Sequence, residues 1–528
     1  ETDSTQSKIW MVVTKNLDTG ELVCHTEVKT LKPLIEQAEC VIGHNLIGFD
    51  AYHLKTLWKM EIPQAKCWDT LIVSRLLKPD IADGHSLEAW GRRLGSKKID
   101  YTAVYKELRL ETDESYVYVD KHEWDDPILG RMQDYCEQDV ELTAKLFTEL
   151  KKQLKSQKFS DYSVELEHQV AWIVAQQVRN GVLIDQRALM LLKAEVEDEL
   201  ATLTNKMVAE FEPTIVVMKT KTKSIPFNPG SRMQIIERLK SRGWVPTEFT
   251  EKDNVVLDEE ILKSMDIPEA KVFLRFFELQ KINSFLTNWD DKIEQDGRIH
   301  GRVITNGAVT GRMTHSSPNL GQVPSAQTEL GKRCRALFIV PEGCSMVGID
   351  ASGLELRMLA HYMKDQAYVQ TVISGSSKAG TDIHTVNQKA AGLPTRDSAK
   401  TFIYAFLYGA GDSKIGSIVG GGAKDGKKLK EKFLRQTPAL ASLLDKISRV
   451  AASGKVPGLD GRQLWVRSDH AAPNTLLQGA GAIVMKKALV LLDEEIRKNK
   501  WDARFVVNVH DEFQMEVATH HADLVGKA

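Results

Sequence analysis

The spacing of apolar positions changes several times along the chain, and these changes predict the order of its elements. Over about the first 150 residues, strand-like apolar runs such as 9–13 alternate with helical spacing such as that of 134–150. This alternation is typical of a compact α/β unit. The lysine-rich stretch 151–158 then indicates a linker. From 164 to about 211 the spacing is helical, and Gly181 predicts a break between two helices.

The second half of the chain has a mixed pattern. The turn at 227–230 interrupts the helical region, and helical spacing then resumes as far as about 293. Further on, the pattern predicts a hairpin and strand over 340–349, a helix over 396–409 and a second hairpin over 505–517. We therefore expect a small α/β domain followed by a larger mixed domain.

Composition narrows the class of protein. A chain of 528 residues exceeds what one hydrophobic core usually organises, so two or more domains are expected. The formal net charge is −2, so a nucleic-acid surface must come from local segregation of the 70 basic residues. The six cysteines are scattered without a C-x-x-C pair, which argues against a zinc site and suggests free thiols in a reducing compartment.

No uninterrupted apolar run of about eighteen residues and no signal peptide is found, so we expect an intracellular protein without a membrane partner. Both ends of the chain look cut. It begins at Glu1 without an initiator methionine, and it ends at Ala528 within what looks like the start of a helix.

Two of the predicted strand ends carry candidate metal ligands. Asp350 follows an apolar strand at the point where a helix begins, which suits either a metal ligand or a helix N-cap. Asp511 and Glu512 lie side by side at the tip of the second hairpin. They repel each other unless cations or solvent relieve them, so the tip is either a metal site or a solvated acidic turn.

The helix predicted after Thr395 presents two cations and an aromatic ring on one face, because Arg396, Lys400 and Tyr404 follow one another at intervals of four residues. Such a face can grip a triphosphate and stack beside a sugar or base. It can also be a simple solvated basic face. The strongly apolar remainder of the helix favours the first interpretation.

The amino-acid sequences of these segments resemble the motifs of a known family. D-A-S-G-L-E-L-R at 350–357, R-D-S-A-K-T-F-I-Y-A-F-L-Y-G at 396–409 and V-H-D-E at 509–512 are similar to the three palm-and-fingers motifs of family A DNA polymerases. They are most similar to those of the replicative enzymes of T-seven-like bacteriophages. Shorter matches extend the resemblance over essentially the whole chain, at 310–312, 319–324, 382–384 and 467–478.

The resemblance implies a DNA-templated DNA polymerase that extends a primer 3′ end with dNTPs. Asp350 and Asp511 would bind two Mg²⁺ ions, for which Mn²⁺ can substitute, and the backbone carbonyl of Ala351 would be a further ligand. One ion would lower the pKa of the primer 3′-hydroxyl, and the other would bridge the incoming triphosphate. Positioning and charge stabilisation would carry most of the rate enhancement.

Further roles are implied for the residues around this centre. Arg396 and Lys400 would hold the β- and γ-phosphates, with Lys400 a candidate proton donor to pyrophosphate, and His384 would reach the same phosphates. Glu355 would exclude a ribose 2′-hydroxyl by steric conflict. Tyr404 would stack near the incoming nucleotide and allow dideoxynucleotides. The residues implied to contact the primer–template are Arg312, Asn474, Gln478 and His510, with Glu512 in support.

The first 150 residues carry a second set of acids. Asp50 ends the segment G-H-N-L-I-G-F-D, and Tyr135 and Asp139 lie one helical turn apart. Each fits an ordinary surface residue, but with Glu1 they resemble the DEDD-type 3′–5′ exonucleases. Glu1, Asp50 and Asp139 would then be metal ligands, again for two Mg²⁺, and Tyr135 would position the attacking water. The leading aspartate of the first motif would lie two places before Glu1, so one ligand is missing from this sequence.

The helical region after the linker corresponds to the thumb of such polymerases. Its densest basic cluster, Lys219, Lys221 and Lys223 with Lys206, is expected to contact DNA phosphates, with a solvated loop as the alternative. A thioredoxin-type processivity factor is not expected, because only a short segment separates Phe211 from the turn at 227–230. The basic run 424–435 suits a solvated helix face as well as contact with the template or a helicase.

The fold class implied is α/β multi-domain, with an RNase H-like DEDD 3′–5′ exonuclease domain followed by a right-hand polymerase domain of thumb, palm and fingers. The expected ranges are exonuclease 1–150, linker 151–163, thumb-containing helical region 164–296, palm 297–364 and 456–528 (ending early), and fingers 365–455. Partners would be primer–template DNA, dNTPs, a phage helicase-primase and a single-strand binding protein, in the host cytoplasm.

Two other functions share some of these features. A single-subunit RNA polymerase has a related palm, but Glu355 and the exonuclease domain argue against it. A catalytically silent DNA-binding scaffold is opposed by the intact set of Asp350, Lys400 and Asp511.

Overall fold

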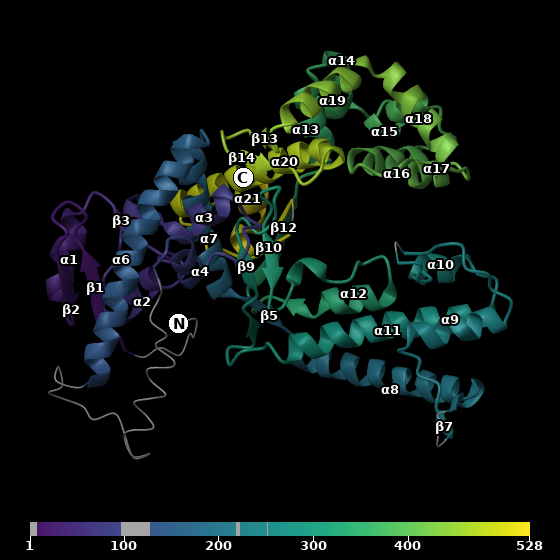
Figure 1. Ribbon diagram of the computed structural model, residues 1–528, viewed down its shortest axis with the longest axis horizontal. Helices are drawn as coiled ribbons and strands as arrows, with labels where there is room; N and C mark the ends of the chain where they lie inside the picture. The colour runs from purple at the N-terminus through teal and green to yellow at the C-terminus, as the bar shows by residue number, and fades with distance from the viewer. Residues whose placement is uncertain (1–7, 97–126, 218–221, 251, 510) are drawn as a thin grey trace. The chain divides into compact units, whose positions relative to one another are not determined.

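The computed structural model describes residues 8–96, 127–217, 222–250, 252–509 and 511–528 (Figure 1). The chain falls into two compact units. The first unit comprises Glu1–Arg179, Val303–Thr314 and Val347–Ala528, and the second unit comprises Asn180–Arg302 and His315–Met346.

The amino-terminal part of the first unit is an α/β arrangement closed by one long helix. Its strands are β1 Val12–Lys15, β2 Leu22–His25, β3 Val41–Gly43 and β4 Cys67–Asp69. Its helices are α1 Val28–Gln37, α2 Asp50–Leu57, α3 Thr70–Leu77, α4 Leu87–Arg93 and α6 Pro127–Ser156, with a 3-10 turn at Gln64–Lys66. β1 and β2 pair antiparallel, whereas β3 and β4 run parallel. Leu142, Leu146 and Leu150, spaced four apart on α6, are buried in a core with residues of α3 and α4.

The range 151–163, predicted as a linker, contains the last turn of α6 and the first residues of α7 (Asp161–Asn180). The predicted break at Gly181 is confirmed, because α7 ends at Asn180 and strand β5 (Val182–Ile184) begins just beyond it. Gly181 has a φ of +58°, a conformation that glycine adopts without strain.

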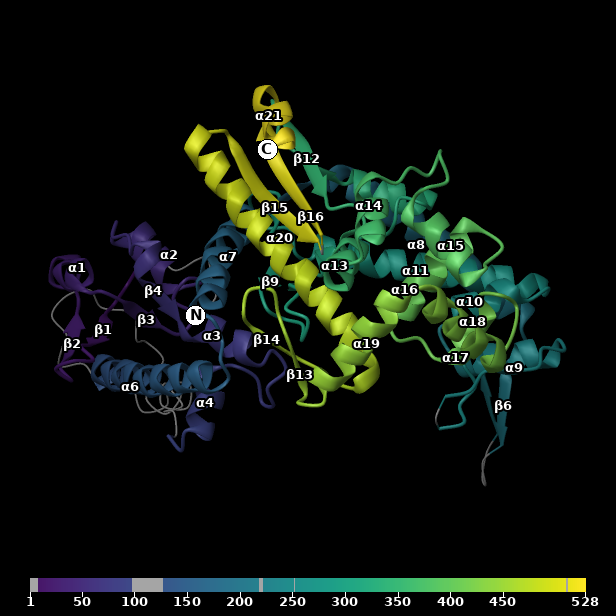
Figure 2. The same ribbon diagram turned by 90° about the horizontal axis from the view of Figure 1, so that it is seen from above.

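A three-stranded sheet lies at the centre of the first unit. Its order is β12 (Cys344–Asp350), β16 (Glu512–Ala518) and β15 (Ala503–Val509), and β15 and β16 form the predicted antiparallel hairpin. The long helix α20 (Ala472–Asn499) runs beside this sheet (Figure 2). One core joins residues of α7, α20 and the hairpin, among them Leu166, Leu489 and Met515.

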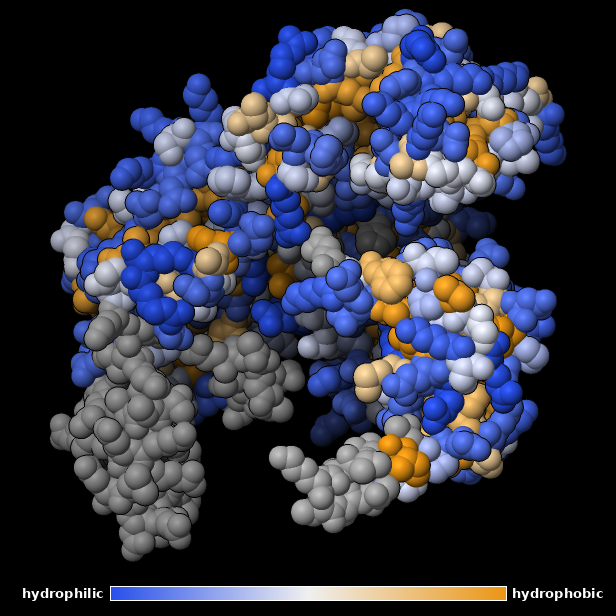
Figure 3. Space-filling model, turned by 45° about the vertical axis from the view of Figure 1, so that its right-hand side comes forward, coloured by the Kyte–Doolittle hydropathy of each residue, from blue (hydrophilic) through white to orange (hydrophobic). Residues whose placement is uncertain are grey.

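The remaining part of the first unit is mostly helical. Its elements are α13 Leu354–Met363, α14 Gln366–Ser374, α15 Ile383–Ala391, α16 Arg396–Leu407, α17 Asp412–Ser417, α18 Ala423–Gln436, α19 Pro438–Ala451, β13 Lys455–Pro457, β14 Gln463–Trp465 and α21 Ala522–Lys527. Phe402 and Phe433 lie at its core. Hydrophilic residues cover much of the α14–α19 region in Figure 3, with apolar patches between them. Four lysines of α18 are exposed, namely Lys424, Lys427, Lys428 and Lys432.

The stretch Asp469–Asn499 is the one described helix that is long and apolar enough to cross a membrane. Of its apolar window, 72% is buried inside the protein, as in the core helix of a globular domain.

The second unit is built on paired helices and a small sheet. β5 lies between β11 (Phe338–Ile339) and β8 (Arg298–Ile299). The helices α8 (Gln186–Glu210) and α11 (Pro268–Asp290) run side by side (Figure 1). The other elements are β6 Thr214–Val217, β7 Thr222–Ile225, α9 Arg232–Ser241, α10 Glu259–Ser264 and α12 Glu329–Ala336, with β9 Arg302–Ile304 and β10 Thr314–Ser316 at the unit boundary.

The hairpin predicted within 340–349 is wrong. β11 pairs with β5, and β12 pairs with β16, so the two strands enter different sheets. Between them the amide of Cys344 donates to the Pro341 carbonyl at 3.1 Å, and Gly343 has a φ of +82°. This turn redirects the chain, and the pairing partners come from distant sequence that local periodicity does not reveal.

Candidate active site

Asp350 and Asp511 are brought together by the central sheet. Asp350 is the last residue of β12, and Asp511 lies in the turn between β15 and β16. The amide of Ala351 donates to the Asp511 carbonyl at 3.0 Å, which joins the two segments directly. On the same strand, Gly348 lies against the Gln514 side chain of β16, since a Cβ there would lie 3.0 Å from Nε2 of Gln514.

The two carboxylates have no balancing cation. Asp350 is exposed and Asp511 is half-buried, and neither side chain forms an ion pair with any described residue. Two adjacent anions with open coordination fit a hard divalent cation, which prefers oxygen ligands. Within the described ranges, no three His, Cys, Asp or Glu side chains gather as a metal site. The ligand set of two carboxylates and the Ala351 carbonyl stays a prediction.

The α16 helix forms as its sequence predicts. The Thr395 hydroxyl accepts from the Ser398 amide at 3.1 Å, and the Ser398 side chain completes a capping box. Ala399, Phe402, Ile403 and Leu407 are its buried face. Lys400 is exposed on the opposite face, and among the described residues it has no ion-pair partner. The helix and its exposed cation are confirmed, while the binding of phosphate by this face stays a prediction.

Asp382 organises the neighbouring phosphate-binding candidates. It caps α15, where its carboxylate accepts from the His384 amide at 3.1 Å and from the Thr385 hydroxyl at 2.6 Å. It also pairs with Arg396 at 3.0 Å. Burial alone would raise the pKa of Asp382, but the Thr385 and Arg396 contacts outweigh it and hold the pKa at about 2. Asp382 was not predicted as a site residue. Its position directly before Ile383 indicates only a helix N-cap.

His384 lies against Tyr404, with ring centroids 6.2 Å apart. Burial, followed by the nearby Arg396 guanidinium, lowers the pKa of His384 below its usual value. The imidazole is therefore neutral near pH 7 and offers a hydrogen bond rather than a charge.

Glu355 is held by two side chains. Nη2 of Arg312 donates to its Oε1 at 2.9 Å, and the hydroxyl of Tyr408 donates to its Oε2 at 2.7 Å. Burial and the bond to Glu355 raise the pKa of Tyr408 well above its usual range. Tyr404, one turn earlier, has its pKa raised by burial and by the charges of Glu355 and Asp511. Tyr408 was missed in the sequence, although it continues the four-residue series of Arg396, Lys400 and Tyr404.

The structure describes four of the five residues predicted to contact the primer–template, and Arg312 is the one that bonds Glu355. Asn474 and Gln478 are half-buried in the first turns of α20. Glu512 opens β16 and accepts a hydrogen bond from Gln514. His510 lies outside the described residues.

A second acidic centre lies in the amino-terminal α/β part. Asp50 is exposed at the first position of α2, immediately after the loop that follows β3. The loop is held by a residue that sequence reasoning missed, Asp69. Its buried carboxylate accepts from the amides of Asn45 at 3.0 Å and Ile47 at 3.1 Å, and it also caps α3. Burial raises the pKa of Asp69, with these amides opposing the effect.

The other exonuclease candidates are only partly described. Tyr135 and Asp139 are half-buried one turn apart on α6, which packs against β3. Glu1 lies outside the described residues. The basic cluster is likewise divided, since Lys223 is exposed on β7 while Lys219 and Lys221 fall in the range left undescribed.

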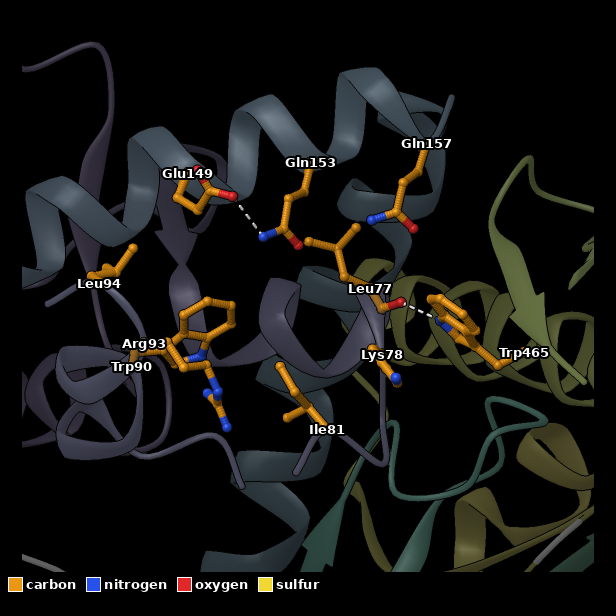
Figure 4. A pocket seen from close by; sticks show the side chains of 10 residues that line it. All are labelled: Leu77, Lys78, Ile81, Trp90, Arg93, Leu94, Glu149, Gln153, Gln157 and Trp465. Carbon is orange, nitrogen blue, oxygen red and sulfur yellow. Dashed lines mark hydrogen bonds between the residues drawn. The ribbon is translucent and has the colours of Figure 1, made fainter. Parts of the chain in front are cut away.

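A pocket of about 530 Å³ lies where α3, α4 and α6 meet Trp465 (Figure 4). The indole of Trp465 donates to the Leu77 carbonyl at 2.6 Å, and the Lys78 ammonium lies 4.8 Å from its ring. None of the residues predicted around Asp350 and Asp511 lines this pocket, which marks a contact between α3 and the β13–β14 hairpin.

Two protein-family models match the chain. The model of DNA polymerase family A matches residues 142–528, and a 3′–5′ exonuclease model matches residues 6–155. The DNA-directed DNA polymerases of Enterobacteria phage T3 and Escherichia phage T7 are each 34% identical to the chain. Each alignment covers 93% of this chain and 88% of the relative.

More distant proteins show the same pattern. DNA polymerase I of Aquifex aeolicus is 26% identical, with 99% of this chain and 89% of the relative covered. Among solved structures, the POL domain of Pol1 from M. smegmatis in complex with DNA primer-template and dNTP matches with a TM-score of 0.77. The match covers 96% of this chain and 86% of that chain at 18% identity, so it shows the fold.

Proposed function

The chain belongs to DNA polymerase family A and is a DNA-directed DNA polymerase with a 3′–5′ exonuclease domain, and we propose that Asp350 and Asp511 form the metal-binding centre of its polymerase site. The observation that carries this proposal is the backbone hydrogen bond from Ala351 to Asp511, which brings together two segments whose carboxylates form no ion pair with a described residue. Mg²⁺ bound there would acidify the primer 3′-hydroxyl and neutralise charge on the phosphates. The family favours this activity over an RNA polymerase or a silent scaffold.

The exposed face of α16 is proposed to hold the triphosphate. Lys400 carries an exposed ammonium, unpaired among the described residues, that can neutralise the β- and γ-phosphates and deliver a proton to the leaving pyrophosphate. Arg396 is oriented by Asp382, so its guanidinium is fixed before a nucleotide arrives. His384, neutral near pH 7, donates a hydrogen bond to a phosphate oxygen without adding charge.

Sugar selection is assigned to Glu355. A carboxylate braced by Arg312 and Tyr408 cannot swing away when a 2′-hydroxyl approaches, so a ribonucleotide meets a fixed obstacle. Tyr404 on the same helix stacks near the incoming nucleotide. Arg312, Asn474, Gln478 and His510 complete the site by contacting the minor groove of the primer–template, through acceptors that all correct base pairs share.

Asp50, Asp139 and Glu1 are proposed as metal ligands of the exonuclease, with Tyr135 positioning the water. The support is the placement of Asp50 at a helix start that Asp69 fixes. Trimming of a mismatched 3′ end should be lost in Asp50→Ala while primer extension continues. Retained trimming in Asp50→Ala would show that the exonuclease site is formed by other residues.

The protein acts on primer–template DNA and dNTPs in phage genome replication, in the host cytoplasm, together with a helicase-primase and a single-strand binding protein. Lys219, Lys221 and Lys223 are proposed to contact DNA phosphates. No thioredoxin-type factor is proposed, because the segment between Phe211 and the turn at 227–230 is short.

Primer extension with Mg²⁺ tests the polymerase centre. Asp511→Ala should lose extension by at least about a thousandfold, because the ion loses one of two carboxylates. Asp502→Ala removes an exposed acid from the other end of the same hairpin and should extend normally. An Asp511→Ala protein that still extends would refute the proposed chemistry.

A further inference from the structure

A buried cluster of five polar side chains lies inside the first unit. Its members, each no more than 6% exposed, are Glu167, Asn306, Asp460, Arg462 and Lys486. They come from α7, the segment after β9, the β13–β14 turn and α20. Two anions balance two cations, so the cluster is neutral as a whole.

Three side chains accept from the two cations of the cluster, and Glu167 and Asn306 each accept from both. Oε1 of Glu167 lies 2.7 Å from Nη2 of Arg462 and 2.6 Å from Nζ of Lys486. Asp460 lies 2.6 Å from the same guanidinium nitrogen. Oδ1 of Asn306 accepts from Lys486 at 3.0 Å and from Nη1 of Arg462 at 3.3 Å. The Asn306 amide is therefore fixed by both cations at once.

Stability is a weak reason for such a cluster. Removing two cations and two anions from water is costly, and apolar side chains of similar volume often fill the same space with equal or greater stability. The cluster is better explained by what it holds in place.

The cluster lies directly beneath the turn that ends at Arg312. Gly311, with a φ of +73°, packs so closely that a Cβ there would lie 3.2 Å from Nη1 of Arg462 and 3.5 Å from Oδ1 of Asn306. The turn is closed by two backbone bonds, from Gly311 to the Ala308 carbonyl at 2.8 Å and from Ala308 to the Arg312 carbonyl at 3.2 Å. Asn306 and Arg462 therefore pack against the backbone that carries Arg312.

Arg312 in turn holds Glu355, through the 2.9 Å bond to Oε1. We propose that Asn306, Arg462 and Lys486 are positioning residues, and that they set the sugar selectivity of the polymerase by holding Arg312 against Glu355. This inference rests on the proposed role of Glu355 as the obstacle to ribonucleotides. Both cations are buried, so they would act on the site through the turn at 308–312 and not by direct contact with DNA or nucleotide.

The test is a double-mutant cycle read as discrimination, the ratio of kcat/KM for a dNTP to that for the matching rNTP. Asn306→Ala removes the shared acceptor without leaving a new charge, and it should lower discrimination about tenfold. Arg312→Ala should lower it as well. If Asn306 acts through Arg312, the double variant should match Arg312→Ala alone. Additive losses would overturn the proposal, and so would unchanged discrimination in Asn306→Ala.

Two controls separate the possible failures. Gln177→Ala removes a buried polar side chain from α7, outside the cluster, and should leave discrimination unchanged at a similar cost in Tm. An equal loss of discrimination in Gln177→Ala would show a general effect of destabilisation and refute the positioning role. Glu355→Ala tests the proposed function on its own. If it leaves discrimination unchanged the obstacle is assigned wrongly, whereas a loss in Glu355→Ala with none in Asn306→Ala refutes only the positioning role.

Discussion

The hydroxyl of Tyr408 donates a hydrogen bond of 2.7 Å to Oε2 of Glu355. The helix α16 thereby braces a carboxylate on α13, and Arg312 braces its other oxygen. Tyr408→Phe removes one brace and keeps the ring. We expect discrimination against ribonucleotides to fall about threefold to tenfold, the size of one partly exposed hydrogen bond to a charged group. Single-nucleotide incorporation of a dNTP and its matching rNTP measures the change.

The matched control is Tyr404→Phe, one turn earlier on the same helix. It removes a hydroxyl that does not bond Glu355 and should leave ribonucleotide discrimination unchanged. If both variants lose discrimination equally, the Tyr408 brace is not the cause.

The Tyr408 brace should be insensitive to pH. Burial and Glu355 raise the pKa of Tyr408, so the stabilisation that this bond contributes is complete below the ordinary tyrosine pKa of about 10. It is lost only as pH rises through the still higher pKa of the folded protein. We therefore expect discrimination to stay constant from about pH 7 to about pH 9. A decline within that window would contradict the assignment.

Local structure at this site could be predicted from the sequence, because its causes are local. Thr395 caps α16 with the capping box that its neighbour Ser398 completes, and the apolar face of the helix fixes its orientation. Tyr408 could also have been predicted, since it lies four residues after Tyr404 and continues the same helical face. That Asp350 and Asp511 lie close together was expected only through the family resemblance.

Contacts between distant segments could not be predicted. Glu167 and Lys486 are 319 positions apart, and nothing in the spacing around either residue indicates that they meet. Asp69 similarly supports the Asp50 loop through two backbone amides, and a backbone donor leaves no mark in the sequence. The erroneous hairpin at 340–349 has the same origin, because its strands find their partners in distant segments.

Asp382→Asn should weaken nucleotide binding and stability together. The amide still caps α15, but the ion pair with Arg396 is lost, so the guanidinium is less well oriented. We expect KM for dNTPs to rise several-fold and the free energy of unfolding to fall by about 1–2 kcal/mol. Steady-state kinetics and denaturant titration give both values.

The stability difference between wild type and Asp382→Asn has a defined pH dependence. The folded pKa of Asp382, about 2, lies below the usual aspartate value. Its contribution is therefore complete above about pH 4 and is lost as pH falls toward the folded pKa. Denaturant titrations at about pH 5 and about pH 8 should give the same difference. A difference that grows between them would show that another group titrates with the pair.

Lys400→Ala should slow chemistry more than binding. The exposed ammonium neutralises charge that develops as pyrophosphate leaves, so we expect kcat to fall by about a hundredfold or more. Lys428→Ala, which removes an exposed ammonium from α18, is the matched control and should retain kcat. Rapid-quench measurement of a single incorporation gives the rate. A rise in KM with an unchanged kcat would show that α16 binds the nucleotide without a role in the transition state.

Asp69→Asn should separate the two activities of the protein. The amide can still accept one hydrogen bond, but its nitrogen faces the amide of either Asn45 or Ile47, so the loop before Asp50 loses a fixed contact. We expect trimming of a mismatched 3′ end to fall at least about tenfold, the size of one buried hydrogen bond to a charged group, with primer extension within about twofold of wild type.

Glu61→Gln, which alters an exposed acid paired with Lys55 on α2, should trim normally. Trimming at the wild-type rate in Asp69→Asn would show that the loop is held without this carboxylate. Loss of both activities would show that Asp69 stabilises more than the exonuclease loop.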